Sequence, residues 1–503
     1  MNTQKSSSQI KWGALISYVA LGVTTLIGLL YTPWMVDKIG RANYGLYTLA
    51  ISLINIFLLD FGLGSAVSRF VSKYRAEGNQ QGVNNIMGAI YKLYIAIDIL
   101  IVVTLVVVYF FIDSIYVKLT PAEIEQFRIL YILVAFSHAI SFPLSPLNGL
   151  LNAYEKFVQL KLCTLCTKVA TVAAVVIALR FSNSVTTVVG LNVLFELLGL
   201  LVKFTIVRTN VPVRVNFRQV EKGIYRTLFS FTVWTAIISL MQRFTHSFAP
   251  SVLAMTSNTI EIALYAPAVT LEGYFYTLAT AVNGLFLPRI SRYIADKKED
   301  GILNLMIKVG QYQVVVLGLV FVGFVCVGQE FMVNWMGPDF RKTYYLAMLI
   351  LLPTLISSTQ QIAHTTVIAK KLIKYQAICM CVTGVLGLAL SYVVSMYVGA
   401  LGVCIGTAVT SLANISYMNT VYKRKAGIDV FTFYKKCYLK AIPCYAITIV
   451  LGLLITNRVP LAGWAGLFIK AGLVAVLFGL TMWFGYISKA ERQQLIQKIK
   501  RRK

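Results

Sequence analysis

The chain has 503 residues, of which 58% are hydrophobic and only 13% are charged, and its mean hydropathy is +0.73. A soluble domain carries about 25% charged residues, so this composition excludes a water-soluble fold and favours a lipid bilayer as the solvent. The net charge of +27 is spread over short clusters between apolar runs, which is typical of membrane-protein loops and argues against a nucleic-acid partner.

A membrane-crossing helix needs about 20 consecutive, mostly apolar residues. Runs of this kind recur fourteen times, so we expect an all-α integral membrane protein with about fourteen transmembrane helices. The first run has no small-residue cleavage pattern and is interpreted as a retained span rather than a secretory signal. The runs cover residues 12–36, 45–67, 86–112, 126–148, 158–180, 185–207, 227–256, 263–288, 304–328, 344–367, 375–397, 400–422, 438–456 and 464–486.

The distribution of Lys and Arg predicts the orientation of the chain. With a cytoplasmic N-terminus, the inside segments hold 34 of the 46 basic residues and the outside segments hold 8. Cytoplasmic loops are enriched in Lys and Arg, so we expect both termini on the cytoplasmic side of a multi-pass protein. An even number of spans is consistent with that arrangement.

The sequence repeats itself weakly at a distance of about one half of the chain. Residues 44–50 (YGLYTLA) resemble residues 262–268 (IALYAPA), and Ser68-Arg69 resembles Ser291-Arg292. Six spans per half is an even number, which predicts two six-helix lobes in a parallel repeat related by a pseudo-two-fold axis along the membrane normal. We expect an N-lobe over residues 1–207, a cytoplasmic linker over 208–226, a C-lobe over 227–422, and two C-terminal helices with a basic cytoplasmic tail over 423–503.

Charged residues inside spans cost several kcal/mol unless they are paired or hydrated, so each is a candidate site residue. At a rise of 1.5 Å per residue, Asp60 and Lys92 lie about 12 and 9 Å from the inner face on adjacent spans, which indicates an ion pair. Asp98, Lys168 and Glu196 lie about 15–18 Å from that face, near the bilayer middle. They form either the wall of a cavity or a buried charge network within the first lobe.

In the second half, Arg243 and Glu272 both lie about 24 Å from the inner face by the same rise. The planar fork of an arginine binds phosphate oxygens bidentately, so Arg243 is a candidate diphosphate ligand; alternatively, Glu272 neutralises it. His138 is a weaker candidate, since a lone histidine in a span is more often a packing residue.

Arg69 and Arg292 belong to a basic inner mouth, where an anionic head group could first be captured. Ordinary positive-inside anchoring explains the same residues. Lys470, near the outer end of the last span, is expected to extend its ammonium to the interface. The tail over residues 489–503 is expected to lie against anionic lipid.

Enzyme signatures are missing from the sequence: it contains no Walker A loop, no H-E-x-x-H and no G-x-S-x-G. Cys163 and Cys166 form a C-x-x-C inside an apolar run without a second ligand pair, so no metal site is expected. We therefore expect a non-enzyme without cofactors. Its energy would come from an ion gradient (H⁺ or Na⁺), the membrane potential or downstream consumption of product.

Four stretches, taken in their order along the chain, resemble the polysaccharide and O-antigen flippases of the multidrug/oligosaccharidyl-lipid/polysaccharide exporter superfamily. They are residues 30–47 (LYTPWMVDKIGRANYGLY), 60–70 (DFGLGSAVSRF), 148–156 (NGLLNAYEK) and 334–339 (NWMGPD). The resemblance implies a V-shaped two-lobe fold with a central cavity. It also implies alternating-access flipping of an undecaprenyl-diphosphate-linked oligosaccharide for O-antigen or capsule assembly. The implied setting is the bacterial cytoplasmic membrane, with membrane lipids, glycosyltransferases and a polysaccharide polymerase as partners.

Two other functions are considered. An ion-coupled multidrug exporter of the same superfamily would suit the midplane carboxylates Asp98 and Glu196. A membrane-bound glycosyltransferase or polymerase needs large outside loops with carboxylates, whereas the outside loops here are short. The basic linker and the flippase-like stretches favour a sugar-lipid substrate.

Overall fold

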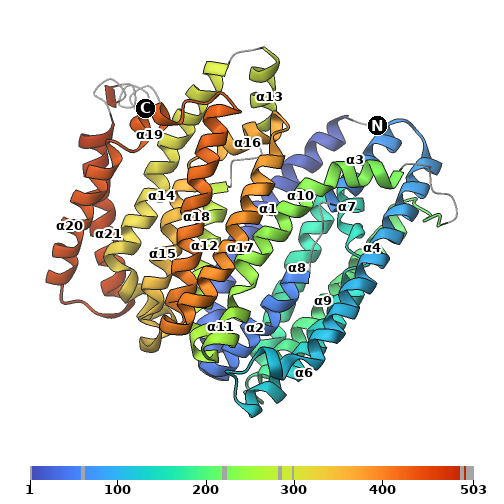
Figure 1. Ribbon diagram of the computed structural model, residues 1–503, viewed down its shortest axis with the longest axis horizontal. Coiled ribbons are helices and arrows are strands. Elements are labelled where there is room, and N and C mark those ends of the chain that lie inside the picture. The colour runs from blue at the N-terminus through green and yellow to red at the C-terminus, as the bar shows by residue number, and fades with distance from the viewer. Residues whose placement is uncertain are drawn as a thin grey trace. The chain divides into compact units, whose positions relative to one another are not determined.

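The computed structural model describes residues 3–57, 63–217, 224–280, 286–296, 299–487 and 492–493, and within them the secondary structure is helical, without a strand (Figure 1). The first helices are α1 (Thr3–Ile39), α2 (Arg41–Phe57), α3 (Leu63–Ala76), α4 (Gln80–Phe110), α5 (Ile112–Ile115), α6 (Pro121–Ser141), α7 (Pro146–Ala153), α8 (Phe157–Ala178), α9 (Val185–Asn210), α10 (Ile224–Ser247) and α11 (Ala249–Thr256). They are followed by α12 (Thr259–Thr280), α13 (Leu287–Ala295), α14 (Glu299–Met336), η2 (Pro338–Phe340), α15 (Thr343–Ser358), α16 (Gln361–Ala369), α17 (Ile373–Val398), α18 (Ala400–Arg424), α19 (Val430–Cys437), α20 (Ala441–Arg458), α21 (Gly463–Thr481) and η3 (Met482–Tyr486).

The all-α membrane fold expected from the sequence is confirmed. Wherever the structure describes them, the apolar runs lie on one helix or on consecutive helices. Among the described residues, ten helical segments are long and apolar enough to cross a membrane, and the pair α15–α16, bent by 55°, makes an eleventh. The other three runs include α2 and α3, α10 and α11, and α12 and α13; two of these runs contain residues 58–62 and 281–285, which lie outside the described residues.

The chain packs as two compact units. Unit 1 comprises Met1–Ala263 with Ser395–Gly399, and unit 2 comprises Leu264–Val394 with Ala400–Lys503. Unit 1 therefore contains α10 and α11, which follow the expected linker. The two lobes were predicted from a sequence repeat, whereas the two units are defined by packing. The division into lobes therefore stays a prediction.

The two halves of the chain share local irregularities at a nearly constant distance. Pro33 interrupts α1, and Pro250, 217 residues later, stands in the first turn of α11 directly after the end of α10. The helix pairs α6–α7 and α15–α16 each end in a left-handed residue, Glu155 at φ 57° and Lys371 at φ 58°, 216 residues apart. A non-glycine residue in this region costs about 1 kcal/mol or more, so its recurrence supports a repeated structural plan.

The same backbone hydrogen bonds close these two turns. Lys156 N donates to Leu151 O at 2.9 Å, and Leu372 N donates to Val367 O at 2.9 Å. Such bonds satisfy carbonyl groups that a helix leaves free in its last turn. The broken spans thus end in the same way in both halves.

The expected linker is described in part. Helix α9 continues to Asn210, and residues 211–217 then run without regular structure across the start of α4. Arg214 N donates to Asn84 Oδ1 at 3.0 Å, and Asn216 N donates to Asn84 O at 3.1 Å. A Cβ on Gly88 would lie 1.8 Å from Asn216 O, so only glycine permits this approach.

The two C-terminal helices α20 and α21 pack against each other and against α14 in unit 2 (Figure 1). Tyr445 on α20 donates its hydroxyl hydrogen to the carbonyl of Val314 on α14. A Cβ on Gly318 would lie 2.0 Å from the Tyr445 hydroxyl oxygen, and a Cβ on Gly452 would lie 2.8 Å from Cys326 Sγ. Small residues therefore allow these helices to approach closely, as is usual in membranes.

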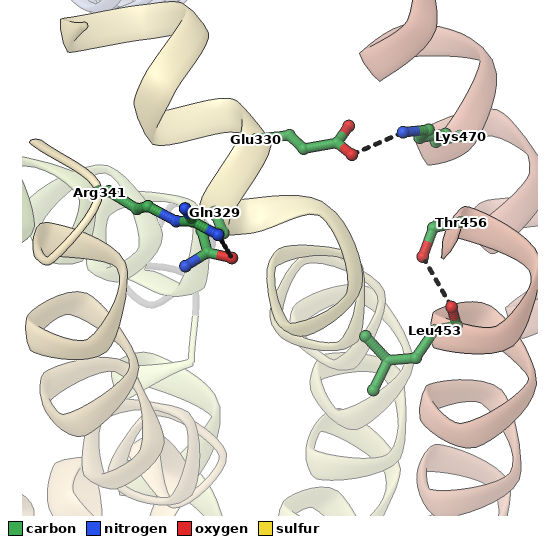
Figure 2. A network of polar contacts seen from close by, with 6 residues as sticks. All are labelled: Gln329, Glu330, Arg341, Leu453, Thr456 and Lys470. Atoms are coloured by element: carbon green, nitrogen blue, oxygen red, sulfur yellow. Dashed lines mark hydrogen bonds and ion pairs between the residues drawn. The ribbon is translucent and has the colours of Figure 1, made fainter. Parts of the chain in front are cut away.

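The prediction that Lys470 extends to the interface is wrong. Its side chain is 5% exposed, and its ammonium lies 2.5 Å from the Glu330 carboxylate of α14 (Figure 2). The reason is that Lys470 faces α14, where a carboxylate compensates the buried charge. Two further hydrogen bonds lie nearby: Arg341 Nη2 to Gln329 Oε1 at 3.4 Å and Thr456 Oγ1 to Leu453 O at 3.2 Å.

Two glycines of α14 make a matched pair for testing the close approach of α20. Gly318→Ala should lower the melting temperature of the purified protein, because overpacking costs about 1–3 kcal/mol. Gly323→Ala should not lower it, because a Cβ there meets nothing within 4 Å and alanine favours helix. Thermal unfolding in detergent measures both. Equal melting temperatures for the two variants would contradict the tight α14–α20 contact.

Candidate functional site

A polar cluster in unit 1 is built on the antiparallel neighbours α4 and α6. The rings of Tyr94 and Phe142 lie 5.2 Å apart, and Tyr131 donates to Leu105 O at 2.7 Å. Both contacts define the same register between the two helices. On α4, Asp98 follows Tyr94 by four residues and precedes Leu105 by seven. On α6, which runs in the opposite direction, His138 precedes Phe142 by four residues and follows Tyr131 by seven.

Asp98 and His138 therefore lie at one level, on the facing sides of α4 and α6. Asp98 is 8% exposed and His138 is 2% exposed. Within the described part of the chain, Asp98 Oδ1 and both ring nitrogens of His138 are buried without a hydrogen-bond partner. Buried polar atoms are almost always partnered, so these three atoms mark a place where a proton, ion or water can be held.

Glu196 on α9 joins this cluster through α6. Ser137, next to His138, donates to Glu196 Oε2 at 3.3 Å. Helix α6 thus carries one polar neighbour toward α4 and another toward α9. Sequence reasoning missed Ser137, although the adjacent pair Ser137-His138 in an otherwise apolar run was a signal for it.

Lys168 on α8 lies close to the same level. A Cβ on Gly199 of α9 would lie 2.4 Å from Thr167 Oγ1, which sets the register of α8 against α9. By rise per residue, Lys168 and Glu196 then differ in level by about 3 Å. Both side chains are exposed, and no ion pair within 4 Å joins these two described residues. Their use as site residues stays a prediction.

Asp60 lies outside the described residues, so the expected pair with Lys92 stays a prediction. Lys92 is exposed on α4. Arg69 on α3 and Arg292 on α13 are exposed on two short helices. Near Arg69, Arg75 donates to the carbonyl of Ala153 and lies 4.0 Å from the centroid of the Tyr154 ring, a contact that the sequence did not predict.

Arg243 on α10 is half-buried and donates from Nη1 to Asn55 O at 3.2 Å. Asn55 lies in the last turn of α2, where carbonyl groups carry partial negative charge and favour a cation. A guanidinium has five N–H donors, so this bond leaves donors for a further acceptor. Arg243 is therefore both a brace for the end of α2 and a candidate anion ligand.

Glu272 on α12 is buried in unit 2 and accepts a hydrogen bond from Thr354 Oγ1 of α15 at 3.0 Å. Prolines interrupt both helices close to this bond, Pro267 in α12 and Pro353 in α15. Arg243 and Glu272 fall in different units, and each has a partner within its own unit. The expected neutralisation of Arg243 by Glu272 stays a prediction.

A second polar network stabilises the bend between α15 and α16. Gln360 donates to Asn419 Oδ1 at 2.7 Å and to the Tyr434 hydroxyl at 2.9 Å. Thr359 and Tyr438 share a hydrogen bond of 2.7 Å. Within the described residues, no group of three or more His, Cys, Asp or Glu side chains is arranged to hold a metal ion.

Comparison with known proteins gives a family and a fold. The family model "Polysaccharide biosynthesis protein" matches residues 11–288. The structure is similar to that of the lipid II flippase MurJ in an inward closed conformation, with a TM-score of 0.72 and 14% identity over 93% of this chain and 98% of that one. No curated protein sequence matches the chain.

Two multidrug transporter structures are also similar. One is an inward-facing multidrug resistance MATE family transporter of the MOP superfamily, with a TM-score of 0.64 and 13% identity over 83% of this chain and 99% of that one. The other is the eukaryotic MATE transporter AtDTX14, with a TM-score of 0.58 and 12% identity over 84% and 96%. At these identities the likeness shows the fold.

The unpartnered oxygen of Asp98 leads to a stability prediction. Asp98→Leu should raise the melting temperature of the purified protein, because an unsatisfied buried polar group costs about 1–3 kcal/mol. Ser137→Ala should lower it instead, because this change removes the bond to Glu196. Thermal unfolding of both variants in one detergent is the measurement. A lower melting temperature for Asp98→Leu would mean that the carboxylate is satisfied in the folded protein.

Proposed function

Because the chain belongs to the polysaccharide biosynthesis protein family, we propose that it moves an undecaprenyl-diphosphate-linked oligosaccharide from the inner to the outer leaflet by alternating access. The family match over residues 11–288 is the observation that carries this proposal. The fold supports it, since the lipid II flippase shares that fold over nearly its whole length. The product would serve cell-surface polysaccharide assembly, such as O-antigen or capsule.

The proposed setting is the bacterial cytoplasmic membrane, with both chain termini in the cytoplasm. The surplus of Lys and Arg in alternate loops supports this orientation. Glycosyltransferases would build the lipid-linked sugar on the inner side, and a polysaccharide polymerase would consume it on the outer side. These enzymes and the membrane lipids are the partners that the proposal implies.

Arg243 is the residue proposed to bind the diphosphate during passage. Its guanidinium is half-buried, already oriented by Asn55, and has donors left for phosphate oxygens. Lys168 is the second proposed cation, and Arg69 and Arg292 would capture the head group at the inner mouth. A water-filled pathway would keep these charges hydrated between transport cycles.

Energy for the cycle is proposed to come from a proton or sodium gradient. The coupling ion would bind at Asp98, with His138 at the same level on α6 and Glu196 close by. A carboxylate that is buried without a full set of partners changes its charge and hydration readily when an ion binds. The same groups would suit a multidrug exporter coupled to an ion gradient, and the MATE-like fold makes that the second candidate function.

The substrate class can be tested in the source bacterium. Deleting the gene should trap the lipid-linked oligosaccharide on the inner leaflet, and Arg243→Ala should reproduce most of this defect while the protein stays in the membrane. Arg243→Lys keeps a donor for Asn55 O but loses the bidentate fork, so it should give an intermediate export rate. Arg458→Ala, an exposed arginine at the end of α20, is the control and should export normally. An unchanged inner-leaflet pool together with new sensitivity to cationic drugs would favour the exporter.

Ion coupling can be tested in liposomes that contain the purified protein. An imposed pH or sodium gradient should raise the transport rate of the native protein severalfold, and Asp98→Asn should abolish this response. Glu125→Gln neutralises an exposed carboxylate at the start of α6 and should respond like the native protein. An unchanged response of Asp98→Asn to both gradients would remove Asp98 from the coupling mechanism.

A further inference from the structure

A strongly basic surface lies in unit 2 at the ends of α16, α17, α18 and α19. Residues 370–440 contain nine Lys and Arg but a single carboxylate, Asp429. We call this surface the basic rim; it comprises Lys370, Lys371, Lys374, Lys423, Arg424, Lys425, Lys435, Lys436 and Lys440.

Specific contacts join the separate segments of the basic rim. Lys370 Nζ donates to Ala426 O at 2.8 Å, which ties the α16–α17 turn to the loop after α18. Lys374 and Lys425, from those two segments, both lie over the ring of Tyr375, with ammonium-to-centroid distances of 5.2 and 5.7 Å. Two exposed ammonium groups from different segments therefore lie within about 6 Å of the centroid of one aromatic ring.

The single carboxylate of this surface is occupied by the start of α19. Asp429 accepts from Phe431 N at 3.1 Å and from Thr432 Oγ1 at 2.6 Å. These are the bonds of a helix N-cap, and they direct the carboxylate toward its own helix. Asp429 therefore compensates little of the positive charge of the basic rim.

Helix α19 adds an apolar component to the basic rim. Its buried face includes Phe433 and Cys437, and Phe433 contacts the backbone at Gly310 of α14. Its opposite face carries Phe431, 73% exposed, and the next turns carry Lys435, Lys436 and Leu439, the last 63% exposed. A short helix with exposed apolar and basic side chains is typical of a helix that lies in a membrane interface.

We infer that the basic rim binds the phosphate head groups of anionic phospholipids in the cytoplasmic leaflet, with Lys374 and Lys425 as the phosphate ligands beside Tyr375. Lysine clusters at the cytoplasmic ends of spans attract anionic lipid by about 1 kcal/mol per residue. Phe431 and Leu439 enter the acyl boundary beside the head groups, a contact that a soluble anion does not offer. This site rests on the proposed cytoplasmic orientation of these loops, but not on the proposed substrate or coupling ion.

The test uses the full-length protein in detergent, titrated with phosphatidylglycerol or phosphatidylcholine and followed by native mass spectrometry. The native protein should bind phosphatidylglycerol more tightly. Lys374→Gln with Lys425→Gln should weaken phosphatidylglycerol binding about thirtyfold, because two lysines at about 1 kcal/mol each are lost. The same double variant should leave phosphatidylcholine binding within about twofold, since that lipid has no net charge.

Arg341→Gln with Lys342→Gln is the matched control, since it removes two exposed cations between α14 and α15, outside the basic rim. It should bind both lipids like the native protein. Melting temperatures recorded on the same samples show that each variant is folded. Equal affinity of the native protein for the two lipids, or an equal loss in both double variants, would overturn the inference.

Discussion

Hydrocarbon supplies neither a hydrogen-bond donor nor an acceptor, and this constraint explains most of the polar contacts in the chain. Lys470 is buried because Glu330 meets it, and Glu272 is buried with a donor from Thr354. Tyr445 reaches the carbonyl of Val314 across a helix interface that small residues keep narrow. Each of these contacts joins two helices, so satisfying a polar group also positions the elements that carry it.

The cluster around Asp98 departs from this rule. One oxygen of Asp98 and both nitrogens of His138 are buried without partners in the described part of the chain, although the register of α4 against α6 places the two residues at one level. Unpartnered buried groups of this kind are candidates for a functional role, because an apolar side chain of similar size would be easier to bury. Arg243 is intermediate: one donor braces α2, and its remaining donors give it the capacity to bind an anion.

The broken helices have a similar explanation. A helix leaves the carbonyl groups of its last turn without donors, and the chain satisfies some of them at the ends of the two broken spans with left-handed turns at Glu155 and Lys371. The bend between α15 and α16 is held by the side chains of Gln360 and Thr359, which bind Tyr434 on α19 and Tyr438 directly after it. Helix α19 therefore contacts that bend through Tyr434 and also carries Lys435 and Lys436 of the basic rim.

Hydropathy was sufficient to predict an all-α membrane protein and the helical runs in the described part of the chain, and four short stretches carried the resemblance to the flippase family. Both depend on residue type and local order. The partners of individual side chains were decided by the tertiary structure. From the sequence we predicted that Asp98, Lys168 and Glu196 lie near one depth. The same reasoning treated His138 as a weaker candidate, did not identify Ser137 and wrongly predicted an interfacial position for Lys470. Depth along a helix follows from a constant rise per residue, whereas the rotation and register of one helix against another depend on the packing of many side chains at once.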